Sequence, residues 1–178
     1  VSNVSGYSTM TVAQHTLMLI LALATNLVNY RTDVQRGVWA NNHFFCLLHH
    51  PIIELAGKNL VIIGYGEIGQ AVAKAAQGLG MNVLIAQSLR DNEGAATSHS
   101  DRIPRRPLRE LLPHADVITL HCPLTPQTHH LIGAEQLSQM KPSALLINVS
   151  RGGLVDEQAL LAALKSGQIA GAGIDVLT

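Results

Sequence analysis

The sequence is poor in charged residues and aromatic side chains, and it carries no net charge. Only 13% of its 178 residues are charged and 3% are aromatic, whereas 47% are hydrophobic, and 12 basic residues balance 12 acidic ones. This composition excludes an intrinsically disordered chain. A net charge of zero gives no reason to expect a nucleic acid or an anionic membrane as partner. The composition therefore predicts a globular protein with a substantial buried core.

Cysteine is also scarce, and long hydrophobic runs are missing. Cys46 and Cys122, together with nine histidines, show no spacing typical of a metal site or a disulfide framework. We therefore expect no metal, and free thiols in a reducing compartment such as the cytoplasm. The most apolar run, Leu17 to Ala24, is too short to span a bilayer, and the N-terminus lacks the basic region of a secretory signal. No membrane partner is expected.

The feature that organises the chain is an apolar run over residues 60–63 that leads into the glycine turn 64–69, GYGEIG, and then into a helix-like segment. Gly64 allows a tight turn, Gly66 lets a pyrophosphate approach the backbone, and Gly69 lets the helix pack closely on the strand. The unpaired N–H groups at the start of the helix then face the phosphates. This context favours a dinucleotide site over an ordinary strand-to-helix turn.

Short apolar runs alternate with helical segments through the rest of the chain. Expected strands cover residues 60–63, 82–86, 116–121, 144–149 and 170–176, with a short strand near Ile103, and expected helices cover 67–79, 108–113, 134–140 and 157–166. Gly80 and Gly167 end two of these helices, and Asp156 caps the start of the helix that Gly167 ends. Continuously apolar strands are typical of a parallel sheet covered by helices on both faces. The sequence predicts an α/β fold, a doubly wound parallel Rossmann sheet in three αβα layers.

The N-terminal segment predicts a long helix over residues 10–30, capped by Thr9 or Thr11 and apolar on nearly every face. A short helix over 33–39 and an irregular strap over 43–56 should follow. A helix with so many apolar faces needs cover on more than one side. It lies either under the core or against a second subunit, and we favour a homodimer through this helix.

Ligands of a doubly wound sheet bind beyond the carboxyl ends of its strands. Gln87 follows the second strand, eighteen residues after the last glycine of the turn, where an acidic residue would bind the ribose 2′-hydroxyl of NAD. Gln87 can still bond that hydroxyl, but it does not repel a 2′-phosphate. Arg90, Arg102, Arg105 or Arg106 could pair with such a phosphate or could be solvated loop charges. NAD and NADP therefore both stay open.

The expected strand over residues 116–121 ends at His121, and Cys122 and Pro123 come next. The proline stops the strand and leaves a close wall against a bound cofactor. His121 could be catalytic, but a histidine that ends a strand is more often structural.

Two charged residues follow the last two strands. Arg151 precedes Gly152 and Gly153, which we expect to free the turn, so that its guanidinium points into the crevice. Its planar fork suits a substrate carboxylate, although it could equally pair with a surface carboxylate. Asp175 follows the final strand and could accept from a carboxamide NH₂ or act as a simple cap.

At these residues the chain resembles the D-isomer-specific 2-hydroxyacid dehydrogenases. The resemblance rests on NVSGYST with VAQHT, ELAGKNLVIIGYGEIGQAVA, ADVITLHCPLTPQT, MKPSALLINVSRGGLVDEQAL and GAGIDVL. These segments cover almost the whole chain, and the last two are specific to that family rather than to Rossmann domains in general. The ELLPHADVITLHCPLT segment and the glutamine at position 87 look closest to glycerate dehydrogenases, also called hydroxypyruvate reductases.

The resemblance implies hydride transfer between NAD, or NADP, and a small-molecule 2-oxo or 2-hydroxy acid. The acids would be of the hydroxypyruvate/glycerate or glyoxylate/glycolate type, and a histidine would give the proton to the new hydroxyl. Arg151 matches the family's catalytic arginine, which anchors the carboxylate of the 2-oxo acid and polarises its carbonyl.

The resemblance also assigns cofactor contacts. The backbone of Glu67 and Ile68 would meet the pyrophosphate, Cys122 would form the adenosine-side wall, and Asp175 would hold the carboxamide. Residues 149–151 would border the nicotinamide ribose. The expected cofactor-binding residues are Gly64, Gly66, Glu67, Ile68, Gly69, Gln87, Cys122, Pro123, Val149, Ser150, Arg151 and Asp175.

The family's catalytic glutamate and histidine, and its N-terminal substrate-binding domain, have no counterpart in these 178 residues. We therefore expect residues 1–178 to form an NAD(P)-binding Rossmann domain that is inactive alone. Residues 1–56 would be a helical lead-in and residues 57–178 the βαβ core. The alternatives are an NAD-sensing, corepressor-like interaction module and a relative of formate or phosphite dehydrogenases.

Overall fold

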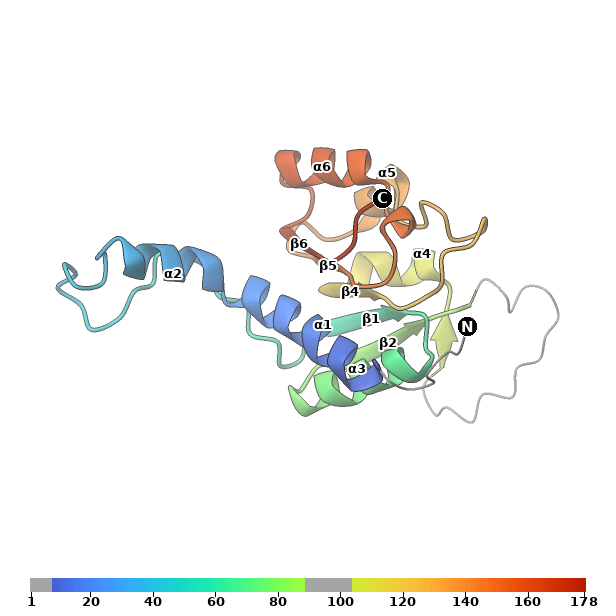
Figure 1. The fold of residues 1–178 in the computed structure, drawn as a ribbon, viewed down its shortest axis with the longest axis horizontal. Helices are drawn as coiled ribbons and strands as arrows, with labels where there is room; N and C mark the ends of the chain where they lie inside the picture. Colours follow the sequence, from blue (N-terminus) through green and yellow to red (C-terminus); the bar gives the residue numbers. More distant parts are fainter. Residues whose placement is uncertain (1–7, 89–103) are drawn as a thin grey trace.

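The computed structural model describes residues 8–88 and 104–178, whose strands form one parallel sheet in the order β3-β2-β1-β4-β5-β6 (Figure 1). The strands are β1 (Asn59–Ile63), β2 (Asn82–Ala86), β3 (Arg105–Arg106), β4 (Val117–Leu120), β5 (Leu145–Asn148) and β6 (Gly171–Ile174). This strand order is that of a doubly wound Rossmann sheet, so the predicted fold class is confirmed. The short strand expected near Ile103 is β3, whereas Ile103 itself lies outside the described residues.

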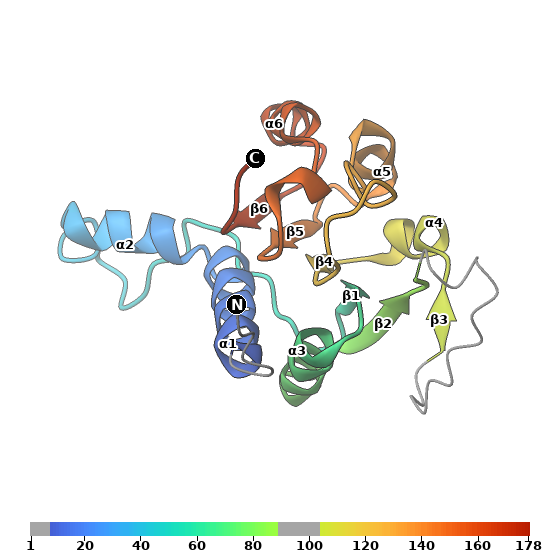
Figure 2. The same ribbon diagram turned by 45° about the vertical axis from the view of Figure 1, so that its right-hand side comes forward.

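Helices cover both faces of the sheet, as Figure 2 shows. One face carries α1 (Thr9–Ala24) and α3 (Glu67–Gly78), and the other carries α4 (Leu108–Leu111), α5 (Ala134–Gln139) and α6 (Glu157–Ser166), with the short 3₁₀ helices η2 (Leu112–His114) and η3 (Gly152–Leu154). Successive strand residues serve opposite faces. Leu60 and Ile62 belong to the core cluster under α1 and α3, whereas Val61 and Ile63 belong to the cluster on the other face. The fold therefore has three layers with a core on each side of the sheet.

Local signals that end the core helices are confirmed. Gly80 follows α3 with φ +77°, and Gly167 follows α6 with φ +71°, both in the left-handed region that favours glycine. The Asp156 carboxylate accepts from the backbone N–H groups of Gln158 and Ala159, at 3.0 and 3.1 Å, at the start of α6. These caps fix where the chain turns back toward the next strand.

The predicted single helix over residues 10–30 is wrong. The chain breaks after α1 at Asn26, which adopts φ +51°, and α2 (Leu27–Gln35) continues at an angle of 62°. The Asn26 side chain stabilises the break by donating to the carbonyl oxygen of Pro51. The helix expected over 33–39 is instead the end of α2, followed by turns. No single described helix is long and apolar enough to cross a membrane, although the bent pair of α1 and α2 together meets that requirement.

The cap of α1 differs from the prediction, and its cover is in part that of a helix lying on the core. Ser8, rather than Thr9 or Thr11, occupies the N-cap position, and no side chain caps the helix. One stripe of the helix is buried, formed by Ala13, Thr16, Ile20 and Ala24. The helix therefore lies on the core along one side and leaves its other apolar side uncovered.

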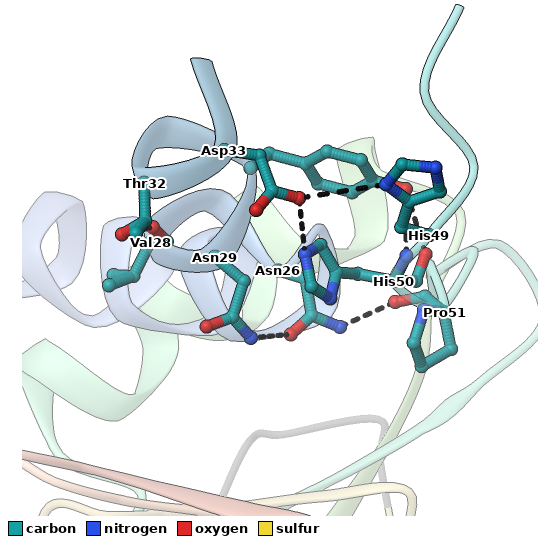
Figure 3. Close-up of polar contacts among 9 residues, drawn as sticks. Asn26, Val28, Asn29, Thr32, Asp33, His49, His50 and Pro51 are labelled. Carbon is teal, nitrogen blue, oxygen red and sulfur yellow. Dashed lines mark hydrogen bonds and ion pairs between the residues drawn. The ribbon is translucent and has the colours of Figure 1, made fainter. Parts of the chain in front are cut away.

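Residues 27–56, which we call the arm, leave the sheet as α2 and return beside α1 to the core (Figures 1 and 2). The expected strap over 43–56 has no helix or strand, and it folds back on α2 through polar contacts (Figure 3). The Asp33 carboxylate lies 2.8 Å from Nε2 of His50 and 3.9 Å from Nδ1 of His49. These contacts hold the arm to itself, and Ile53 and Leu55 at its end join it to the core cluster under α1 and α3.

Candidate functional site

The glycine turn between β1 and α3 has a different constraint at each glycine. Gly64 has φ +95°, and a Cβ there would lie 2.5 Å from the carbonyl carbon of His121. A Cβ on Gly69 would lie 2.3 Å from the carbonyl oxygen of Gly64. Gly66, the N-cap of the 12-residue α3, has no atom within 4 Å of such a Cβ. Two glycines therefore close the turn, and the third leaves open space at a helix N-terminus, which fits a pyrophosphate.

A pocket of about 540 Å³ opens where β1, β2 and β4 end. It brings together five of the predicted site residues: Gly64, Gly66, Gln87, Cys122 and Pro123. Its volume is in the range of small-molecule sites, and it begins at the glycine turn and runs toward the end of β2. In a doubly wound sheet this position is the adenosine half of a dinucleotide site.

The titratable side chains on the β4 side of this pocket are uncharged at neutral pH. Burial lowers the pKa of His121 to about 4, and Nε2 of its ring lies 3.0 Å from the Thr119 hydroxyl. Burial raises the pKa of the Cys122 thiol. The His121 backbone N–H also donates to the carbonyl oxygen of Ile63 at 2.7 Å. His121 therefore belongs to the wall of the pocket, as the structural interpretation of a strand-ending histidine predicts.

The predicted residues at the start of α3 have their side chains occupied elsewhere. Glu67 accepts from the hydroxyl of Thr9 at 3.3 Å, and Ile68 packs against the core under α1 and α3. Neither of them lines the pocket. Any contact of these two residues with a cofactor therefore falls to their backbone N–H groups.

The turn after β5 is built around Asn148, which the sequence analysis did not single out. Its side chain is 1% exposed, donates to the carbonyl oxygen of Arg151 at 2.9 Å and accepts from the N–H of Ser150 at 3.1 Å. The Ser150 hydroxyl in turn donates to the carbonyl oxygen of Leu120 at 2.9 Å. A polar residue ending an apolar strand was the available signal. Asn148 sets the backbone from which Arg151 projects.

Arg151 itself is exposed, and its Nη1 donates to the carbonyl oxygen of Ser150 at 2.7 Å. Within residues 8–88 and 104–178 no carboxylate lies in ion-pair range of its guanidinium. The surface-pairing alternative therefore has no support in this part of the chain.

The expectation that two glycines free this turn is wrong. A Cβ on Gly152 would meet the backbone of Leu177 at 2.2 Å, and a Cβ on Gly153 would meet the side chain of Leu124 at 3.1 Å. Both glycines are buried. They let the turn after Arg151 pack tightly, so the arginine stands on a rigid support.

Asp175 lies beyond β6 and is paired with a residue that the sequence analysis did not assign. Its Oδ1 is 3.4 Å from Nε2 of His15 on α1, and its side chain stays 51% exposed. Its backbone N–H donates to the carbonyl oxygen of Asn148 at 3.0 Å, which ties it to the β5 turn. A histidine inside an otherwise apolar helix was the only sequence signal for this contact.

The four arginines considered for a 2′-phosphate separate clearly. Arg90 and Arg102 lie outside the described residues. Arg106 is exposed and pairs with Glu110 on α4 at 3.5 Å, whereas Arg105 lines the pocket beside Gln87. In the same described ranges, no three histidine, cysteine or acidic side chains gather as metal ligands would.

Known proteins that resemble the chain share this architecture. Glycerate dehydrogenase from Methylorubrum extorquens is 48% identical over 177 residues, which cover 99% of this chain and 53% of the relative. The NAD complex of a D-isomer-specific 2-hydroxyacid dehydrogenase from Lactobacillus delbrueckii ssp. bulgaricus has a TM-score of 0.82 and 33% identity, over 99% of this chain and 51% of that one. An acyclic imino acid reductase in complex with NADPH and D-arginine has a TM-score of 0.84 and 33% identity, over 97% of this chain and 52% of that one.

The chain thus spans about half the length of the relatives it matches. The model of the NAD-binding domain of D-isomer-specific 2-hydroxyacid dehydrogenases matches residues 17–178. That match includes the glycine turn, the pocket wall and the Arg151 turn. The chain therefore belongs to the D-isomer-specific 2-hydroxyacid dehydrogenase family, of which it forms the NAD-binding domain.

Proposed function

We propose that the chain is the cofactor-binding half of an oxidoreductase that transfers a hydride between NAD(P)H and a small 2-oxo acid. Substrates of the hydroxypyruvate/glycerate or glyoxylate/glycolate type fit best, because the relative at 48% identity is a glycerate dehydrogenase. The observation that carries the proposal is Arg151, an exposed guanidinium at the carboxyl end of β5 with no carboxylate partner in the described residues.

Arg151 would bind the carboxylate of the 2-oxo acid through its planar fork and polarise the carbonyl that is reduced. The Asn148 bonds and the packed glycines hold the backbone of this residue, so little entropy is lost when the substrate binds. When bound, NAD(P)H supplies the hydride. The chain's own part is to orient the acid and to stabilise the charge that develops on its oxygen.

The other predicted residues would hold the cofactor along the crevice. The glycine turn would bind the pyrophosphate, Gln87 the adenosine ribose, and Cys122 and Pro123 the adenosine face. Asp175 would accept from the carboxamide NH₂, with His15 fixing the orientation of its carboxylate. Backbone contacts would come from Glu67, Ile68, Val149 and Ser150.

A chimera tests the activity. The segment of the Methylorubrum extorquens glycerate dehydrogenase that matches this chain is replaced by the chain, and NAD(P)H oxidation is followed with hydroxypyruvate, glyoxylate, formate and phosphite. We expect reduction of the 2-oxo acids. Arg151→Gln should lower kcat/KM by roughly a hundredfold or more. Arg109→Gln, on the exposed side of α4, is the control for lost charge. Activity that survives Arg151→Gln, or turnover only of formate or phosphite, contradicts the proposal.

We also propose a homodimer through α1 and the arm. The uncovered side of α1 forms an apolar groove of about 520 Å³ with α3, lined mainly by Met10, Leu17, Met18, Leu21 and Leu27. The arm exposes Phe44, Phe45 and Leu48 at 73%, 92% and 79% of their surface. An apolar groove of this kind is typical of an interface.

Sedimentation equilibrium tests the dimer with two matched variants. Leu21 and Leu164 are 39% and 38% exposed, but only Leu21 lies in the groove. We expect Leu21→Lys to give a monomer and Leu164→Lys to leave the dimer intact. Stable dimers persist at about tens of micromolar protein. A wild-type chain that is monomeric at that concentration would contradict the interface.

We further propose that residues 1–178 act as one NAD(P)-binding domain, with residues 1–56 as lead-in to the core of residues 57–178. In the lead-in, α1 packs on β5 and β6 and completes one face of the sheet. This packing supports a single domain made of the two parts. A cytoplasmic location fits the free thiols of Cys46 and Cys122.

A further inference from the structure

Glu67 is the first residue of α3, and it carries two groups with opposite effects on a bound anion. Its backbone N–H belongs to the unpaired donors at the start of this 12-residue helix, directly after Gly66, which lines the pocket. Its side chain is exposed and is the only acidic one in the first turn of α3. The positive end of a helix attracts a carboxylate as it attracts a phosphate. The Glu67 carboxylate and a pyrophosphate therefore compete for the same place.

The Thr9 hydroxyl on α1 holds this carboxylate to one side. It donates to Oε2 of Glu67 at 3.3 Å, and Glu67 does not line the pocket. Thr9 is the first residue of α1, but no side chain caps that helix, so its hydroxyl is available for this bond. Within residues 8–88 and 104–178 no lysine, arginine or histidine lies in ion-pair range of Glu67. The position of the carboxylate thus depends on a neutral group of another helix.

Free space lies over the first turn of α3. A Cβ on Gly66 would meet no atom within 4 Å, so the protein leaves the start of the helix open. Exposed side chains change rotamer rapidly. A Glu67 carboxylate that lost its bond to Thr9 would therefore turn toward the N-terminus of α3, where the helix dipole stabilises a negative charge. In that position it would repel a pyrophosphate.

We propose that Thr9 is a latch: its hydroxyl holds the Glu67 carboxylate away from the N-terminus of α3 and so keeps the place of the pyrophosphate open. The inference rests on the proposed function, because it concerns the same site. Figure 2 shows α1 beside α3, and the latch connects the start of α1 with the affinity for the cofactor. A change at the start of α1 that breaks the bond lowers that affinity.

Calorimetric titration of the 178-residue chain tests the latch, with NADH or NADPH, whichever binds the wild type more tightly. Thr9→Val removes the hydroxyl and keeps the shape of the side chain. We expect it to weaken the dinucleotide roughly fivefold at low ionic strength, which is about the effect of one charge on another a few ångströms away in water. Added salt should reduce this loss. Thr9→Ser keeps the hydroxyl and should bind as the wild type does. In Glu67→Gln, which has no carboxylate to hold, the further change Thr9→Val should have no effect.

Two matched variants serve as controls. Thr25→Val removes a hydroxyl at the other end of α1, where it donates to the carbonyl oxygen of Leu21 at 2.7 Å, and Glu135→Gln removes an exposed carboxylate from the first turn of α5. Neither should change the affinity, and thermal unfolding of each variant shows that the fold is kept. Unchanged affinity in Thr9→Val, or a loss of the same size with and without the Glu67 carboxylate, would overturn the inference while the proposed function stands. A wild-type chain that binds neither dinucleotide would overturn the proposed function and the inference with it.

Discussion

Replacing Gly66 by alanine separates folding from cofactor binding. Gly66 has φ −84° and ψ −162°, a conformation open to any residue, and a methyl group there meets no protein atom within 4 Å. The fold should therefore accept the change. Alanine is a poorer N-cap than glycine, which costs about 1 kcal/mol and lowers Tm by roughly 2–4 °C in a domain of this size.

The same methyl group occupies the space over α3 through which a pyrophosphate would approach the backbone. We expect Gly66→Ala to weaken NAD(P)H at least tenfold, which corresponds to about 1.4 kcal/mol. Gly78→Ala, at the other end of α3, is the matched control, because a methyl group there also meets open space. It should leave affinity unchanged and add up to about 1 kcal/mol of stability.

Fluorescence titration with the nucleotide measures the affinity, and thermal unfolding followed by circular dichroism measures the stability. Both are run on the two variants and the wild type. Wild-type affinity in Gly66→Ala would refute the placement of the pyrophosphate. Gly64→Ala provides the contrast, since its φ of +95° and its 2.5 Å approach to the His121 backbone predict a loss of folding.

The remaining predictions concern stability. Burial lowers the pKa of His121 from 6.5 to about 4, so the unfolded chain takes up a proton at a higher pH than the folded chain does. The free energy of unfolding should therefore fall by on the order of 3 kcal/mol as the pH drops from the first pKa to the second. His121→Asn should flatten this part of the profile in urea titrations. Burial raises the pKa of Asp116, but a backbone N–H and the Lys141 ammonium, 2.8 Å away, lower it by more, so the pKa lies below its ordinary value. Its contribution is therefore present above about pH 4 and lost below, and an unchanged acid limb in Asp116→Asn would count against it. Asn148→Ala should cost about 2 kcal/mol, because it removes two bonds of a buried amide, and denaturation that matches the wild type would contradict this role.

Much of the core could be predicted because its signals are local. The expected strand over 82–86 matches β2, and the expected helix over 157–166 matches α6. Each depends on a short apolar run and on a cap or glycine within a few residues. The N-terminal helix could not be predicted in the same way. Its apolar pattern continues through Asn26, and the break there depends on a bond to Pro51, which lies 25 residues further along the chain.

The candidate site shows the same limit. The order and spacing of the glycines, Arg151 and Asp175 along the chain indicated a dinucleotide site and an acid-binding arginine. They could not show that His15 pairs with Asp175, because α1 reaches that carboxylate only when it packs on β5 and β6.

The sequence by itself determined the fold class, the position of the glycine turn and the family, because these depend on residue types at short spacings. Only the tertiary structure decided which of the neighbouring residues Arg105 and Arg106 faces the pocket, and that Gly152 and Gly153 pack rather than free their turn. The physical reason is that strand pairing and close packing are contacts between distant segments. Their register selects one face for each side chain, and no local pattern records that selection.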